Sequence, residues 1–119
     1  VATRGATALE AGGFTPPDVK QLQAQLELTA PRLLEVLRVL ERKGSVVRVA
    51  QDVWYAASVL EQARAKLLEF LASHPEVTVA EYRTLLGASR KYALALLDHF
   101  DRAALTIRVG DARKLRRSA

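Results

Sequence analysis

Residues 89–116 read SRKYALALLDHFDRAALTIRVGDARKLR, and the spacing of apolar residues changes once within this stretch. The first part repeats apolar residues at helical spacing, at Ala93, Leu96, Leu97, Phe100 and Ala104. This spacing predicts a helix with one buried stripe, and Ser89 stands where an N-cap is expected. From Leu105 the pattern alternates, and Gly110-Asp111 separates two short runs. The stretch therefore predicts a helix followed by a β-hairpin with a short turn.

Two more helices are predicted upstream of this one. Ser58 with Glu61 forms a capping box before a run of apolar residues at helical spacing, which stops at His74-Pro75. Thr78 with Glu81 forms a second capping box, and the short helix that it begins ends at Gly87. Three helices and a hairpin, with a short turn between the second and third helices, make the winged-helix arrangement.

The same order of elements occurs earlier in the chain, which indicates an internal repeat. An offset of 60 residues pairs Leu37 with Leu97 and Arg48 with Arg108. The earlier copy has a helix before Gly12-Gly13, a second that starts at Thr15-Pro16-Pro17-Asp18 and runs to about Leu26, a third over 29–43, and hairpin strands at 45–50 and 53–56 around Gln51-Asp52. The predicted fold class is mostly α with small β-hairpin wings, as two tandem winged-helix domains at residues 1–57 and 58–119.

The positive charge of the chain is concentrated near its end. The net charge is +5, yet residues 1–88 hold ten Lys and Arg against ten Asp and Glu, whereas residues 89–119 hold eight against three. Such an excess favours a polyanion as partner. Because residues 1–57 hold seven Lys and Arg against six Asp and Glu, the first domain is expected to serve as a spacer or a secondary contact.

Several classes of function have no support in the sequence. There is no cysteine, no phosphate-binding GxxxxGK[ST] loop and no GxGxxG, and the two histidines lie far apart in sequence. We therefore expect no catalytic residue, no metal site, no cofactor in this chain, and a binding module rather than an enzyme. No apolar run is long enough to span a membrane, so we expect a cytoplasmic protein. Methionine is absent, so a chain that starts at Val1 is expected to be a fragment.

The start of the last predicted helix has the features of a phosphate site. Arg90 and Lys91 follow Ser89 directly, although cations are unfavourable where the helix dipole is already positive. The free amides of a helix start bind anions, so these two cations favour a bound phosphate. Tyr92 is either a stacking surface for a base or a packing residue. Asp98, further along the exposed stripe, would repel a nucleic-acid backbone, so contact is expected at the first turn.

The predicted hairpin carries further cations beside that helix. Alternation places Leu105, Ile107 and Val109 on one face and Thr106 and Arg108 on the other. The return strand carries Arg113, Lys114 and Arg116. Some of these cations are expected to pair with Asp101 or Asp111, and the others to bind a backbone.

SRKYALALLDHFDR followed by LTIRVGDARKLR resembles the last winged helix of the bacterial selenocysteine-specific elongation factor family, SelB. The resemblance covers about residues 77–116 by motif, and the first copy resembles the preceding winged helix by architecture. It implies binding of the selenocysteine insertion (SECIS) hairpin in mRNA. It also implies that an N-terminal part outside this chain binds GTP and selenocysteinyl-tRNA, and that the full-length protein works on the ribosome. The RNA-binding residues that we expect are Arg83, Ser89, Arg90, Lys91, Tyr92, Arg108, Gly110, Arg113 and Lys114; Asp111 matches the wing motif.

Two other functions stay open from the residues alone. A DNA-binding transcription regulator is the more common use of winged helices, and it predicts a dimer on a pseudo-palindrome. Since no dimerisation helix is evident, a monomer is expected. A protein-interaction module that uses an apolar surface near Trp54 and Tyr55 is the other possibility, but it leaves the C-terminal charge unexplained.

Overall fold

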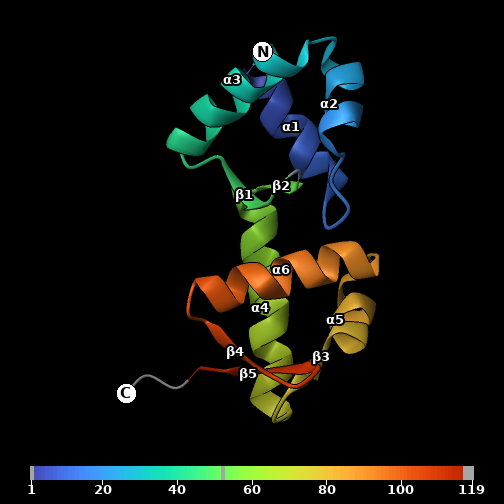
Figure 1. The fold of residues 1–119 in the computed structure, drawn as a ribbon, viewed down its shortest axis with the longest axis vertical. Coiled ribbons are helices and arrows are strands. Elements are labelled where there is room, and N and C mark those ends of the chain that lie inside the picture. The colour runs from blue at the N-terminus through green and yellow to red at the C-terminus, as the bar shows by residue number, and fades with distance from the viewer. Residues whose placement is uncertain (1, 52, 117–119) are drawn as a thin grey trace. The chain divides into compact units, whose positions relative to one another are not determined.

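The structure is a computed structural model that describes residues 2–51 and 53–116 (Figure 1). The contacts divide the chain into two compact units, Val1–Glu61 and Gln62–Ala119. This division lies inside helix α4 (Ala57–Ser73), four residues after the boundary that the sequence predicts at residue 57. Each unit is described separately below.

The first unit contains three helices and a hairpin, in the order that the sequence predicts. The helices are α1 (Ala2–Gly12), α2 (Val19–Leu26) and α3 (Ala30–Arg42), and the strands β1 (Val46–Ala50) and β2 (Val53–Ala56) pair antiparallel. The predicted turn at Gln51-Asp52 lies partly outside the described residues, because Asp52 is not among them.

Two of the predicted helix starts are wrong. Helix α2 is capped by Asp18, whose carboxylate accepts from the Gln21 amide at 2.8 Å, so the helix begins after Thr15 and the two prolines. Helix α4 begins at Ala57, directly after β2, so Ser58 lies inside the helix and is not its cap. The cap of α2 thus lies three residues after the predicted one, and α4 follows β2 without an intervening residue.

Two aromatic side chains of β2 are buried. Trp54 and Tyr55 are 3 % and 0 % exposed, and the Tyr55 hydroxyl donates to the Phe14 carbonyl at 2.8 Å. The guanidinium of Arg48 lies 5.7 Å from the centre of the Trp54 ring. The Trp54 and Tyr55 side chains are therefore not part of an exposed apolar surface that a protein-interaction module could use.

The second unit adds a small three-stranded sheet to its helices. After α4 come β3 (Val77–Thr78), α5 (Val79–Leu86), α6 (Arg90–Arg102), β4 (Thr106–Val109) and β5 (Ala112–Leu115). The strand order is β3-β5-β4, and both pairings are antiparallel. The hairpin β4–β5 is the predicted wing. Strand β3 has no counterpart in the sequence prediction, because two residues are too few to show an alternating pattern.

The core of the second unit confirms the predicted helical stripes. The capping box of Thr78 and Glu81 is present, with bonds of 2.9 and 3.1 Å, and Gly87 ends α5 with a φ of 65°. The stripe of α6 is buried as expected at Ala93, Leu96, Leu97 and Phe100. Ala104 is the exception, because it is exposed and lies beyond the end of the helix.

Ala104 has a φ of 61°, a left-handed conformation that a side chain disfavours by roughly 1–2 kcal/mol. The offset of 60 residues pairs it with Gly44, whose φ is 77°. We therefore expect Ala104→Gly to stabilise the second unit by about 0.5–1 kcal/mol, after the entropic cost of glycine is subtracted. Thermal unfolding measures this. Ala103→Gly, at a φ of −79°, is the control and should destabilise; equal effects of the two changes would contradict the prediction.

Candidate nucleic-acid interface

A hollow in the second unit brings together residues from α5, α6 and the wing. It encloses about 420 Å³ and is lined by Thr78, Val79, Ala80, Arg90, Leu94, Asp98, Arg108, Asp111 and Arg113. Leu94 and the first residues of α5 supply apolar walls, while arginines and carboxylates supply the charge. Three of the predicted RNA-binding residues, Arg90, Arg108 and Arg113, line this one hollow.

The first turn of α6 is exposed and basic, as predicted. Ser89, Arg90 and Lys91 are exposed, and the Lys91 ammonium lies 5.5 Å from the centre of the Tyr92 ring. Ser89 occupies the N-cap position, but its side chain makes no capping hydrogen bond, which differs from the expected cap. The first amides of a helix have no partner within the helix. This end can therefore donate to an anion, with Arg90 and Lys91 beside it.

The wing presents its cations on two faces. Residues directly opposite in an antiparallel pair share a face, so Arg108 lies beside Arg113 and Ile107 beside Lys114. Arg108 is exposed and its Nε donates to the Gly110 carbonyl at 3.0 Å, across the turn. Gly110 has a φ of 61°, which explains the glycine at this turn. Ile107 is 51 % exposed.

Arg113 does not fit the role of an RNA contact. Its side chain is 1 % exposed, its Nε donates to Asp101 at 2.8 Å, and its Nη2 donates to Asp98 at 3.0 Å. The expected pairing of a wing cation with Asp101 is thus confirmed, and the cation is Arg113. A guanidinium whose donors already face two carboxylates is poorly placed to bind phosphate.

The hollow also contains residues that sequence reasoning does not assign to the site. The sequence identifies Thr78 as a helix cap, but only the pairing of β3 with β5 places it beside the wing. Asp98 is expected from the sequence to repel a backbone from an exposed stripe; the structure instead pairs it with Arg113. Contacts between residues so far apart in the chain leave no local pattern in the sequence.

The remaining predicted residues are not among those that line the hollow. Arg83 is exposed on α5, one turn before the connection to α6, and Lys114 is exposed on β5. His99, on α6, contributes no charge near neutral pH, because burial and then the nearby Arg102 lower the pKa of its imidazole.

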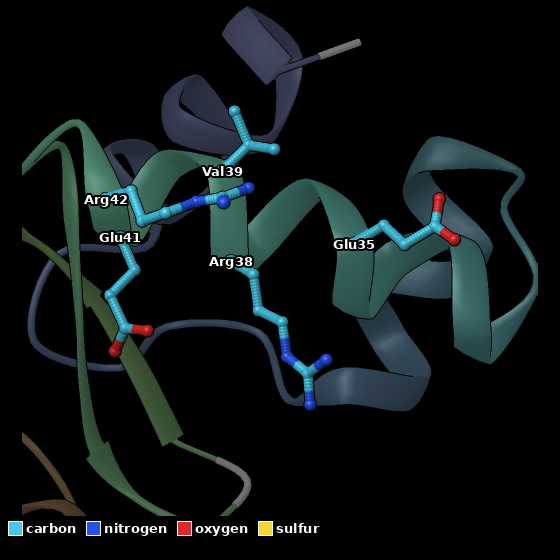
Figure 2. Close-up of a pocket in the computed structure, with 5 residues that line it drawn as sticks. All are labelled: Glu35, Arg38, Val39, Glu41 and Arg42. Carbon is cyan, nitrogen blue, oxygen red and sulfur yellow. The ribbon is translucent and has the colours of Figure 1, made fainter.

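The first unit has a hollow of different character along α3. Figure 2 shows its lining, Glu35, Arg38, Val39, Glu41 and Arg42, all on one helix. Two carboxylates and two guanidinium groups balance one another here. This balance gives no net attraction for phosphate, unlike the first turn of α6.

Metal-ligand clusters and membrane-spanning helices are both absent from the described part of the chain. Among residues 2–51 and 53–116 no three metal-ligating side chains gather into a cluster. Within the same ranges, none of the helices combines the length and apolar character that a membrane span requires.

Comparisons with known proteins point to one family. The curated selenocysteine-specific elongation factor of Desulfomicrobium baculatum is 28% identical over 105 residues, which are 88% of this chain and 17% of that protein. The chain thus spans about a sixth of the length of this relative. Among solved structures, the mRNA-binding domain of elongation factor SelB from E. coli, in complex with SECIS RNA, matches with a TM-score of 0.83 and 22% identity, over 98% of this chain and 97% of that one.

A second structure, of a bacterial selenocysteine-specific elongation factor EF-Sec, matches with a TM-score of 0.78 and 21% identity, over 98% of this chain and 18% of that one. At these identities the structural matches establish the fold. The model of the family described as elongation factor SelB, winged helix, matches residues 69–115, which include α5, α6 and the whole wing. Over residues 69–115 the second unit is therefore similar to the winged helix of the SelB elongation-factor family.

Proposed function

We propose that this chain binds the SECIS hairpin of mRNA through the second unit and thereby tethers a selenocysteine-specific elongation factor to the message. The observation that carries the proposal is the hollow in which Arg90, from the start of α6, and Arg108, from the wing, face one space. It lies within the segment that matches the SelB winged helix. The E. coli domain of the same fold was solved with SECIS RNA.

The physical chemistry of the site suits an RNA hairpin better than a DNA duplex. Side chains cannot read the deep, narrow major groove of A-form RNA, so specific recognition targets loops and bulges. A helix tip with two cations and a basic wing can hold the backbone of such a loop at two places. The free amides and the two neighbouring cations lie at the first turn of α6, and not along its length. Binding at the helix tip follows.

The first unit is proposed to be a second winged-helix domain. Its three helices and hairpin repeat the order of α4, α5, α6 and the wing. Arg48 donates from Nη2 to the Gln51 carbonyl at 2.7 Å, as Arg108 donates to Gly110 across the corresponding turn. At the start of α3, however, Thr29-Ala30-Pro31 has no cation where α6 has Arg90 and Lys91. This difference supports a role as a spacer or a secondary contact for the predicted first domain, residues 1–57.

The wider setting of the chain is part of the same proposal. As a piece of a translation factor it would act in the cytoplasm as a monomer, with GTP and selenocysteinyl-tRNA bound by other parts of the longer protein. The ribosome would then be reached through those parts. In this proposal the chain itself is a binding module and carries no catalytic step.

A binding titration tests the proposal directly. The chain is titrated with a SECIS hairpin from the same source and with a hairpin of identical stem and scrambled loop, at two salt concentrations. We expect at least roughly tenfold tighter binding to the SECIS hairpin, the discrimination of one good base-level contact. Equal affinity for both hairpins would refute the proposal. A duplex DNA of the same length completes the series, and tighter binding to it would favour a transcription regulator.

A further inference from the structure

We infer that Arg113 is a positioning residue, which holds the wing against α6 and fixes where Arg108 lies relative to Arg90; the inference rests on the proposed function. The residue carries one of the eight cations of residues 89–119, yet its side chain is 1 % exposed. Its Nε and Nη2 donors point at Asp101 and Asp98, which lie one turn apart on α6. The guanidinium therefore joins β5 to α6.

Asp101 accepts hydrogen bonds from both strands of the wing. The Thr106 hydroxyl, from β4, donates to its Oδ1 at 2.6 Å, and the Arg113 Nε, from β5, donates to its Oδ2 at 2.8 Å. Both donors belong to buried residues, at 2 % and 1 % exposure. A buried donor that loses its acceptor is costly. One carboxylate on α6 thus anchors the whole hairpin.

The position of Arg108 depends on this anchor. Arg108 is directly opposite Arg113 in the β4–β5 pairing and lies on the same face of the sheet. It reaches the hollow from the wing while Arg90 reaches it from α6. Because the two rim arginines sit on different elements, their separation is set by whatever joins those elements. The hydrogen bonds that Asp98 and Asp101 accept are side-chain bonds of this kind.

Arg113 also reduces the negative charge of the hollow. The Asp98 side chain is 47 % exposed and lines the hollow, where an unpaired carboxylate would repel phosphate. Its Oδ1 is 3.0 Å from the Arg113 Nη2. The buried cation therefore assists anion binding at the rim without touching the anion.

A matched pair of variants separates positioning from plain electrostatics. Asp98→Asn and Asp101→Asn each remove one negative charge from α6. Asp98 accepts one hydrogen bond, from Arg113, and the amide oxygen of Asp98→Asn can still accept it. Asp101 accepts one bond on each oxygen, from Thr106 and from Arg113, and Asp101→Asn leaves only one acceptor oxygen for these two donors. Electrostatics alone predicts tighter RNA binding by both variants. Positioning predicts that Asp98→Asn binds as tightly as the parent chain or tighter, and that Asp101→Asn binds roughly tenfold more weakly, the equivalent of one misplaced charged hydrogen bond.

The measurement is the Kd for the SECIS hairpin as a function of salt. Each phosphate contact contributes roughly 0.7–0.9 to the slope of log K against log salt. We expect Arg113→Lys, which keeps the charge but cannot bind both carboxylates in the same way, to weaken binding with an unchanged slope. Lys114→Ala, at the exposed neighbouring position, is expected to lower the slope. Equal binding by Asp101→Asn and Asp98→Asn, or parent-like binding by Arg113→Lys, would overturn the inference.

A second readout does not depend on RNA. Hydrogen exchange of the wing amides in the free chain should be faster in Asp101→Asn than in Asp98→Asn, because only the former loosens both strands. Thermal unfolding of each variant identifies any that fails to fold. If Asp101→Asn fails to fold, Asp98→Asn is compared with Arg113→Lys instead. If the parent chain shows no preference for the SECIS hairpin, the proposed function fails, while unequal exchange still supports the anchoring role. Equal exchange in both variants overturns that role.

Discussion

Changing Arg90 and Lys91 together to alanine is expected to weaken binding of the SECIS hairpin roughly 100-fold, the size of two lost charge-assisted hydrogen bonds. Both side chains are exposed at the first turn of α6, and neither belongs to the core of the second unit. The folded state should therefore be unchanged. Removal of two cations from the positive end of a helix dipole should even stabilise α6 slightly.

The salt dependence distinguishes a lost phosphate site from a change elsewhere. With two phosphate contacts removed, the slope of log K against log salt should fall by about 1.4–1.8. Arg38→Ala with Arg42→Ala is the matched control, because it removes two exposed cations from α3 of the first unit. If the first unit is a spacer, this control should lose little affinity. Equal losses in the two double variants would contradict the assignment of the site to α6.

The elements of the fold are predictable where a pattern is local. The stripe of α6, the capping box of Thr78 and the Gly110 turn each depend on residues within a few positions of one another. The true starts of α2 and α4 are not predictable in this way, because both Thr15 and Asp18 could cap α2, and α4 continues directly from β2 without a side-chain cap pattern at Ala57. Strand β3 exists only through its pairing with β5, so its own two residues carry no signal.

The sequence predicts the charge of the candidate site, but it does not predict which of its side chains contact one another. Arg90, Lys91 and Arg108 are exposed cations of the second unit, as the sequence indicates. Arg113 has the same charge and a neighbouring place in the wing, yet it is buried between two carboxylates. The alternation of the strand assigns a face to each residue but does not say which face meets α6. The bonds of Asp101 supply that information.

Tyr82 carries the largest expected effect on stability. It lies on α5, is fully buried, and its hydroxyl donates to the Ala63 carbonyl of α4 at 2.8 Å. Tyr82→Ala should cost about 3–5 kcal/mol, as for other large aromatic truncations in cores. The free energy of unfolding of a unit of this size is only about 3–9 kcal/mol. We therefore expect most of the second unit to unfold, and hairpin binding to be lost with it; a variant that melts like the parent would contradict this.

Tyr82→Phe removes the hydroxyl and keeps the ring, and it changes how the free energy of unfolding depends on pH. Loss of the hydrogen bond should cost about 1 kcal/mol at neutral pH. Burial raises the pKa of the Tyr82 phenol well above its ordinary range. The folded unit therefore holds this proton where the unfolded chain, with a tyrosine pKa near 10, releases it. Stability from this group is complete below about pH 10 and falls as the pH rises further, by up to about 1.4 kcal/mol per pH unit. Urea unfolding of the parent at about pH 9, 10 and 11 should show that decline, and Tyr82→Phe should show less of it. Parallel declines in the two proteins would contradict this and would mean that alkaline unfolding begins at another group.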